Sequence, residues 1–307
     1  MRLAHRCAVL AAALLAAVAP NLTGNAMAEE PSYSYLGGLA AQLSGPGQPP
    51  PGANDWNCKP TAAHPDPVVL LNGLSNETIT WNTLSPVLAG AGYCVFTTTY
   101  GAGLLGPVFG AMAPIPESAR QIAAFVDLVR TVTGVEKVDL VGHSMGGAVP
   151  FYYLNYLGGI PKVDDYIALA APLHGSTVSG IAELQPLLES TSLGAQLVEQ
   201  CGPCQLSPGK TFLDILNPDP ALAPDIRFTT VVTRYDEIAT PWPTGQLSGP
   251  NVTNVILQDL CATDFTEHYE LTADPVAVRV VLNALDPAHA EPVGCRVVLP
   301  FLGPIGG

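Results

Sequence analysis

Basic side chains are scarce in this chain of 307 residues. It has 12 Lys and Arg residues against 26 Asp and Glu residues, so its formal net charge is −14 at pH 7. Nucleic acids and anionic membranes are negatively charged themselves and would repel such a surface. We therefore expect neither of them as a partner.

Charged side chains are few altogether, and the sequence has no internal repeat and no run of like charges. Charged residues make up 12% of the chain and apolar residues 48%. This composition indicates a globular protein with much apolar area. Such area suits a protein that acts on an apolar substrate, although a large hydrophobic core would give the same composition.

An apolar run long enough to span a bilayer is missing at the N-terminus. The run Cys7–Ala19 is shorter than the roughly 20 residues that a membrane helix needs. Arg2 and Arg6 precede it, and the small-x-small site Ala26-Met27-Ala28 follows it, so residues 1–28 are predicted to be a cleaved export signal. A membrane anchor is the alternative. It is disfavoured because Pro, Gly and Ser follow the run, and we expect a secreted protein without a stable anchor.

The length of the chain fits one large domain better than two. Residues 29–66 are rich in Pro and Gly and are predicted to form an irregular arm. Residues 67–307 are predicted to form the main folded domain. Within it, residues 176–226 show helical pieces but no strand, which suggests an insertion that lies above the strand ends like a lid.

Strand and helix patterns alternate along this domain. We expect strands at 67–71, 93–97, 137–142, 166–170, 227–233 and 252–258, and helices at 77–88, 116–133, 145–157 and 275–285. Such alternation predicts an α/β fold with a mostly parallel central sheet and helices on both faces.

The motif Gly142-His143-Ser144-Met145-Gly146 lies between an aliphatic strand and an apolar helix. This order is typical of a nucleophile elbow, with Ser144 at the tip of a tight turn. A Cβ at Gly142 or Gly146 would collide with the neighbouring strand or helix. An ordinary strand-to-helix turn is the alternative interpretation.

A serine hydroxyl needs a base to accept its proton and an acid to orient that base. Two histidines lie well past the elbow, His268 and His289. His268 follows the last strand and precedes the last helix, where the base of such a triad belongs, whereas His289 lies in a Pro-rich tail. We predict His268 as the base. His143 is expected to pack, and His174 to be structural or to lie at the rim of the cleft.

The acid is predicted to be Asp236, which lies at the C-terminal end of an apolar strand and before the histidine. Glu237 is the next candidate, followed by Asp259 and Asp264. The role requires a buried carboxylate that stays ionised.

Two backbone N–H groups must stabilise the oxyanion. The first belongs to the residue after the nucleophile, Met145, and the second to the turn after the first central strand, Asn72-Gly73-Leu74. We assign the second donor to Leu74.

Loss of Cys7 with the signal would leave six of the seven cysteines, an even number that in an exported protein predicts three disulfides. The six are Cys58, Cys94, Cys201, Cys204, Cys261 and Cys295. The residues by themselves leave the connectivity open. Cys201-Gly-Pro-Cys204 matches a redox motif, but that motif needs a strand before it and a helix at its first cysteine. We therefore expect a local structural clip rather than a redox or zinc site.

Together the elbow, the Asn72-Gly73-Leu74 turn, Arg234-Tyr235-Asp236-Glu237 and Glu267-His268 resemble secreted bacterial triacylglycerol lipases of the class 2 type, in the α/β-hydrolase superfamily. The resemblance covers residues 58 to 295. It implies the α/β-hydrolase fold and hydrolysis of acylglycerols or related esters through an acyl-enzyme, without a cofactor.

The resemblance also bears on the disulfides, the oxyanion turn and metals. It implies the pairs Cys58 with Cys94 and Cys261 with Cys295, which leaves Cys201 with Cys204. Asn72-Gly73 stands where many such lipases have His-Gly. No acidic cluster matches the calcium site that some of them carry beside the histidine, so we expect no metal.

The leading hypothesis is a monomeric secreted lipase whose substrate is a lipid or other ester. The loop 100–114 and the insertion 176–226 would then form the acyl pocket and its cover. Alternatives that keep the triad are an acyltransferase of the cell envelope and an esterase for polyesters or short chains. A non-catalytic exported binding protein is disfavoured, since serine, acid and histidine occur in the required order.

Overall fold

The computed structural model describes residues 31–102, 109–216 and 218–305. The predicted export signal at 1–28 and part of the expected pocket loop, 103–108, lie outside these residues. Among the described residues, no helix has the length and apolar character needed to cross a membrane.

Six parallel strands form the central sheet, in the order β2-β1-β3-β4-β5-β6. They are β1 (Val68–Leu71), β2 (Val95–Thr98), β3 (Val138–His143), β4 (Val163–Leu169), β5 (Arg227–Val232) and β6 (Val252–Ile256). Every residue of β1 and β3 is buried, because helices cover both faces of the sheet. This is the α/β sheet that the alternating pattern predicts.

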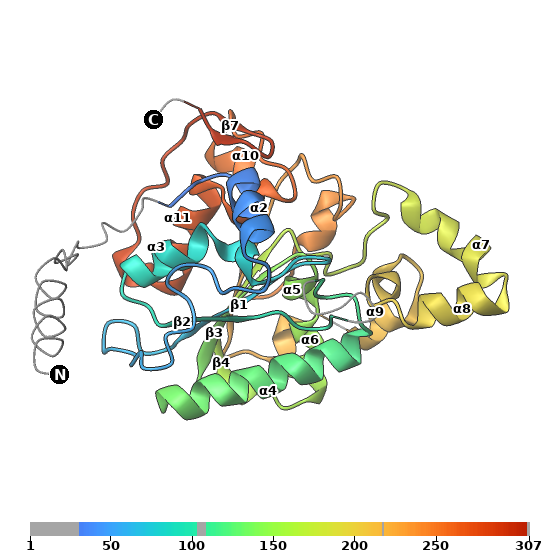
Figure 1. Cartoon of the computed structure of the whole chain (residues 1–307), viewed down its shortest axis with the longest axis horizontal. Helices are drawn as coiled ribbons and strands as arrows, with labels where there is room; N and C mark the ends of the chain where they lie inside the picture. The colour runs from blue at the N-terminus through green and yellow to red at the C-terminus, as the bar shows by residue number, and fades with distance from the viewer. Residues whose placement is uncertain (1–30, 103–108, 217, 306–307) are drawn as a thin grey trace, which may run out of the picture. The chain divides into compact units, whose positions relative to one another are not determined.

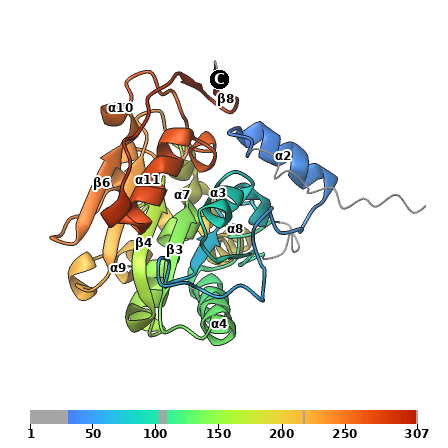
Figure 2. The ribbon, with the colours of Figure 1, turned by 90° about the vertical axis from the view of Figure 1, so that its left-hand side faces the viewer.

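Helices pack on the two faces in separate groups. On one face are α4 (Ile115–Thr133) and α6 (Pro150–Tyr156), and on the other are α3 (Leu84–Gly90) and α11 (Pro275–Leu285), as Figures 1 and 2 show. Gly134 ends α4 with a φ of 82°, a conformation that glycine adopts without strain. Asp274 begins α11, because its side chain accepts the N–H of Ala277.

Two helices are shorter than the sequence pattern predicts. The expected helix at 77–88 is a 3-10 turn, η1 (Thr78–Trp81), followed by α3, and the β-branched residues Thr78-Ile79-Thr80 disfavour a continuous α-helix there. The expected helix at 145–157 is divided into α5 (Met145–Ala148) and α6, because Pro150 has no N–H to donate. Similarly, β6 ends at Ile256 and α10 (Leu257–Leu260) follows.

The N-terminal arm is not irregular throughout, as the prediction had it, because it contains the helix α2 (Tyr35–Ser44). Tertiary contacts fix this helix at both ends. Glu270 Oε2 accepts the N–H of Tyr35 at 2.9 Å, and Glu77 Oε2 accepts the N–H of Gly47 at 2.6 Å. Both glutamates are fully buried, so α2 is held on the domain by charged or polar groups that the sequence pattern does not reveal.

The insertion is helical and has no strand among the described residues 176–216 and 218–226. Its elements are η4 (Ile181–Leu184), α7 (Gln185–Glu189), α8 (Ser192–Glu199), η5 (Pro203–Leu206), α9 (Thr211–Leu216) and η6 (Pro220–Leu222). Figure 1 shows α7 and α8 projecting beyond the sheet. Their base is anchored, since Gly202 donates its N–H to Met112 O at 2.9 Å and Gln205 Oε1 accepts the N–H of Ile115 at 2.7 Å.

Three disulfides join Cys58 to Cys94, Cys201 to Cys204, and Cys261 to Cys295. This is the pairing that the family resemblance implies. The remaining short elements are η3 (Ile160–Lys162), η7 (Trp242–Gly245), η8 (Glu270–Thr272), η9 (Pro287–His289) and a hairpin of β7 (Val298–Leu299) and β8 (Gly303–Pro304).

Candidate active site

Ser144 lies on a sharp turn directly after β3. Its φ of 54° and ψ of −121° are strained for a residue with a side chain. A Cβ on Gly142 would lie 2.0 Å from Gly146 O, and a Cβ on Gly146 would lie 2.0 Å from Leu71 O. Both glycines are therefore required by the close approach of strand and helix, as the elbow interpretation demands.

His268 and Asp236 form a buried pair. His268 Nδ1 lies 3.0 Å from each carboxylate oxygen of Asp236, and both side chains are 2% exposed. Asp236 Oδ1 also accepts the N–H groups of Ile238 at 2.9 Å and Ala239 at 2.7 Å. An ionised carboxylate only accepts hydrogen bonds, so His268 carries its proton on Nδ1 and leaves Nε2 free to act as a base.

The loops that carry this acid and base are tied to one another. Thr233 donates its hydroxyl to Thr266 O at 2.6 Å. Gln258 Nε2 donates to Thr233 Oγ1 at 3.0 Å and to Asp264 O at 3.1 Å. These bonds join the end of β5 to the His268 loop, so the segments that carry Asp236 and His268 are held side by side.

His143 connects the elbow to the same loop. Its Nε2 lies 2.9 Å from the carbonyl oxygen of His268, which can only accept, so Nε2 is the donor. Burial, and then the nearby His268, hold the pKa of His143 well below its usual range, and the ring is neutral. The sequence pattern predicts only packing here. A histidine at the end of a mostly aliphatic strand is the signal that could have indicated this bond.

The predicted oxyanion turn lies against Ser144. A Cβ on Gly73 would lie 3.0 Å from Ser144 Cβ. Neither the N–H of Leu74 nor that of Met145 has an acceptor among the described residues, and the Ser144 hydroxyl likewise has no hydrogen-bond partner there.

Asn72 holds this turn through its side-chain amide. It is fully buried, and its Nδ2 donates to Gly73 O at 3.0 Å and to Asn76 O at 2.8 Å. The hydroxyl of Tyr100 donates to Asn72 O at 2.8 Å.

The other candidates for acid and base lie elsewhere. His289 is 83% exposed and bonds Asp286, and Asp259 is 58% exposed and pairs with Arg234. His174 is exposed, with Nε2 3.0 Å from Gln246 O. Asp264 is buried but accepts the N–H of Thr266. Glu237 is close to His268, but it contacts the backbone and not the imidazole ring. Its Oε2 accepts the backbone N–H of His268 at 3.3 Å.

The sequence matches the family Lipase (class 2) over residues 65–280. That match extends from before β1 into α11 and includes the elbow, Asp236 and His268. The chain belongs to the class 2 lipase family.

Solved structures similar to this class 2 lipase have the same fold. Aspergillus fumigatus lipase B has 17% identity and a TM-score of 0.55, and the match covers 75% of this chain and 53% of that one. Mature Bacillus licheniformis lipase BlEst2 has 19% identity and a TM-score of 0.53, with 78% and 96% covered. The chain thus spans about half the length of the first protein and nearly all of the second. The family and the fold confirm the prediction of a carboxylic-ester hydrolase with the α/β-hydrolase fold.

Buried acids lie in and beside the His268 loop, and the sequence pattern gives no indication of their burial. Burial raises the pKa of Glu267 to about 7 and that of Glu270 to about 8. Burial, and then the charge of Asp264, raise the pKa of Asp274 to about 7. These carboxyl groups come together only because η8 and the start of α11 fold beneath the histidine.

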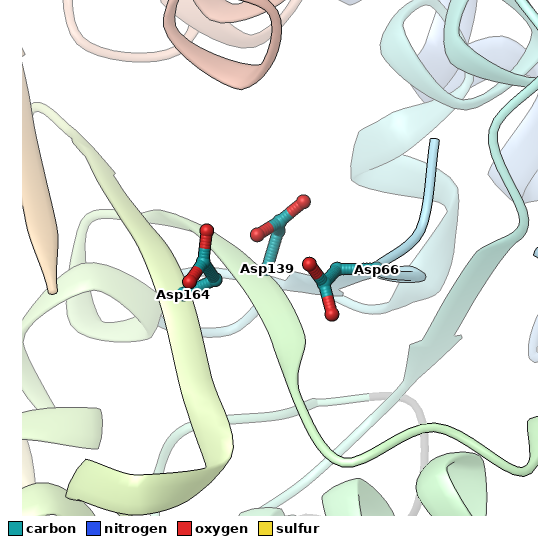
Figure 3. Close-up of side chains that lie close together, drawn as sticks. All are labelled: Asp66, Asp139 and Asp164. Atoms are coloured by element: carbon teal, nitrogen blue, oxygen red, sulfur yellow. The ribbon is translucent and has the colours of Figure 1, made fainter. Parts of the chain in front are cut away.

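A further group of acids lies at the opposite ends of the strands. One oxygen from each of Asp66, Asp139 and Asp164 lies within 4.8 Å of the others (Figure 3). Asp164 is already paired with Lys137 at 2.8 Å and with Arg227 at 3.3 Å, and burial raises the pKa of Asp139 well above its usual value. We assign this group to a charge network that joins strand ends, not to a metal.

Proposed function

We propose that this class 2 lipase is a secreted serine hydrolase of triacylglycerols and related lipid esters. Ser144 is the nucleophile, His268 the general base and Asp236 the residue that orients it. The observation that carries the proposal is the buried His268–Asp236 pair, which His143 ties to the strained turn bearing Ser144.

The reaction has two balanced steps. Ser144 Oγ attacks the ester carbonyl and gives its proton to His268 Nε2, and the N–H groups of Leu74 and Met145 stabilise the oxyanion. The ester C–O bond then breaks, and the alkoxide leaves with the proton from His268. In the second step, water gives a proton to His268 and attacks the carbonyl of the acyl-enzyme. The bond to Ser144 Oγ then breaks, which releases the fatty acid and restores the serine hydroxyl.

Exposed leucines on the insertion support a lipid substrate. Leu184, Leu187, Leu188, Leu193 and Leu197 are between 57% and 72% exposed. They gather on η4, α7 and α8, which are lid-like in position. Such a cluster of large apolar side chains suits contact with lipid rather than water. The net negative charge favours an uncharged lipid over an anionic membrane.

Three disulfides support export, because such bonds persist in oxidising compartments. We propose that residues 1–28 direct the chain there and are removed. The mature enzyme then acts as a monomer and without a cofactor, with esters and not nucleic acid as its partners.

A fluorophosphonate probe tests the nucleophile. We expect the wild-type protein to be labelled at Ser144 and to hydrolyse p-nitrophenyl esters and a triglyceride emulsion. Ser144→Ala should lose labelling and about 10⁵–10⁶-fold in kcat. An unlabelled wild type, or an alanine variant with full activity, would overturn the proposal. Product analysis with an added acceptor alcohol separates hydrolysis from acyl transfer.

A further inference from the structure

The insertion begins with a strained turn. Val178 has a φ of 47° and Ser179 a φ of 51°, and Gly180 follows with a φ of 94°. This left-handed region is unfavourable for a residue with a side chain, and most of all for a β-branched residue such as valine. Strained backbone persists only where its surroundings hold it, and it is common at functional sites. We call residues 176–180 the insertion root.

The insertion root is held by the loop that follows β5 and carries Asp236. Thr177 donates its N–H to Thr240 O at 2.8 Å, and Ser179 donates its N–H to Thr240 Oγ1, also at 2.8 Å. The hydroxyl oxygens of Thr177 and Thr240 lie 2.8 Å apart. The turn thereby brings two serine hydroxyls, those of Ser176 and Ser179, against the Asp236 loop.

The buried hydroxyl of Ser176 has a fixed direction. Ser176 is 6% exposed, and its Oγ accepts the N–H of Val178 at 2.9 Å and that of Thr240 at 3.0 Å. A hydroxyl has two acceptor sites and one hydrogen. Both acceptor sites are taken, so the hydrogen is donated to the remaining partner, Ile238 O.

The peptide group that Ser176 contacts also holds Asp236. The carbonyl of Ile238 and the N–H of Ala239 belong to one planar trans peptide, in which they point to opposite sides. That N–H donates to Asp236 Oδ1 at 2.7 Å. The peptide group is thus bonded to the Ser176 hydroxyl on one side and to the carboxylate on the other, and hydrogen bonds in such a chain strengthen one another.

Ser179 repeats this arrangement on the preceding peptide group. Its Oγ donates to Glu237 O at 2.6 Å. The N–H of the same peptide belongs to Ile238 and donates to Asp236 Oδ1 at 2.9 Å. Each of these two backbone donors to the carboxylate is therefore held, at its carbonyl side, by a serine hydroxyl of the insertion root.

We propose that Ser176 and Ser179 are positioning residues, which set the orientation of Asp236 toward His268 through the two peptide groups. The insertion root then contributes to the chemical step, whereas the exposed leucines further along the insertion contribute to contact with lipid. The inference rests on the proposed function, because the triad gives this orientation its catalytic consequence. The geometry of the acid–base pair itself can be measured without turnover.

Hydrolysis of a short soluble ester by Ser176→Ala and Ser179→Ala gives the first test. Each variant loses one hydrogen bond to a peptide group, so we expect kcat to fall about 5–20-fold for the buried Ser176 and about 2–5-fold for the exposed Ser179, with KM within about twofold of wild type. Because Ser179 is exposed, its variant should fold even if that of Ser176 is unstable. A full kcat in either folded variant removes that serine from the proposal, and a full kcat in both overturns it.

Two other serines of the insertion provide matched controls. Ser207 is buried and donates its hydroxyl to Gln185 Oε1, and Ser190 is exposed and donates its hydroxyl to Leu187 O at 2.6 Å. Among the described residues, neither hydroxyl bonds to the Asp236 loop. Ser207→Ala and Ser190→Ala should keep kcat within about twofold. Losses in these controls as large as in the test variants would overturn the inference.

The same serine variants in an Asp236→Asn background show whether the effect passes through the carboxylate. If it does, replacing Asp236 already removes the benefit, and each serine variant should lower kcat by less than about twofold further. Independent effects on the fold would add instead. Equal fold-losses in the two backgrounds would therefore contradict the positioning role.

Proton NMR gives a readout that needs no turnover. The Nδ1–H of His268, held against the Asp236 carboxylate, should give a downfield resonance that Asp236→Asn removes. We expect Ser176→Ala and Ser179→Ala to shift or broaden this resonance, and Ser207→Ala to leave it unchanged. A wild-type protein that hydrolyses no ester overturns the proposed function, while such a shift still supports the positioning of Asp236. A resonance that neither test variant alters overturns the inference, whatever the enzyme hydrolyses.

Discussion

The carboxylate of Asp236 contacts Nδ1 of His268 and also accepts two backbone N–H groups. Asp236→Asn keeps the size of the side chain but removes its charge and can place an N–H opposite Nδ1, which favours the wrong tautomer of His268. We expect kcat to fall about 10⁴-fold with little change in stability. The measurement is steady-state hydrolysis of a soluble ester.

Asp259→Asn is the matched control for that variant. Asp259 is a weaker candidate for the acid and lies exposed beside Arg234. The same chemical change there should leave kcat within about twofold, since exposed ion pairs contribute little. Comparable losses in both variants would contradict the assignment of Asp236.

Glu270 makes the stability of the fold depend on pH. Burial is the main cause that raises its pKa to about 8, so the folded state holds this proton more tightly than the unfolded state does. The stability that this provides is fully present below the unfolded pKa near 4.5 and is lost as the pH rises through 8. Glu267 and Asp274 titrate near 7, so the window from pH 7 to 8 isolates Glu270 most clearly.

Glu270→Gln should flatten the fall in unfolding free energy between pH 7 and 8, while keeping an acceptor for the N–H of Tyr35. Urea denaturation at several pH values measures this slope, which is on the order of 1 kcal/mol per pH unit for one group. Glu199→Gln, on the exposed surface of α8, should leave the slope unchanged. An unaltered slope in the Glu270 variant would show that another group is responsible.

At the scale of elements, α7 and α8 present their leucines outward instead of toward the core. Replacing Leu187 and Leu193 together by Ser removes apolar surface that burial in lipid would stabilise by roughly 1.5–3 kcal/mol per side chain. We expect the activity on emulsified triglyceride, divided by that on a soluble ester, to fall at least about fivefold. Leu128→Ser, on the exposed face of α4, should not alter this ratio. A ratio that both variants preserve would remove the support that these leucines give to a lipid substrate.

Some helices and strands could be predicted from the local sequence pattern and others could not. The strand before Ser144 and the helix after it follow from aliphatic periodicity and glycine placement, and β1, β3 and β5 lie where that pattern predicts. The helix α2 could not be predicted in this way, because the carboxylates of Glu270 and Glu77 that fix it come from residues 235 and 30 positions away. Local sequence does not encode such partners.

At the scale of the whole molecule, two disulfides close long segments and one closes a short one. Cys58 and Cys94 are 36 residues apart, whereas Cys201 and Cys204 are 3 apart. Constraint of the unfolded chain grows with loop length, so replacing both Cys58 and Cys94 by Ser should cost about 2–4 kcal/mol of unfolding free energy. The same replacement of Cys201 and Cys204 should cost about 1–2 kcal/mol. Urea denaturation, analysed with the same m-value, measures the unfolding free energy of both double variants. A larger loss for the Cys201–Cys204 variant would contradict this order.

The sequence alone determined the sheet class, the elbow, the family and the candidate residues Ser144, Asp236 and His268. Each of these follows from patterns within a few residues or from the order of motifs along the chain. Tertiary structure decided which carboxylate reaches the His268 ring, how Asn72 holds the turn that follows β1, and where buried acids gather. Those outcomes depend on contacts between segments far apart in the chain, and local periodicity carries no information about which of them come together.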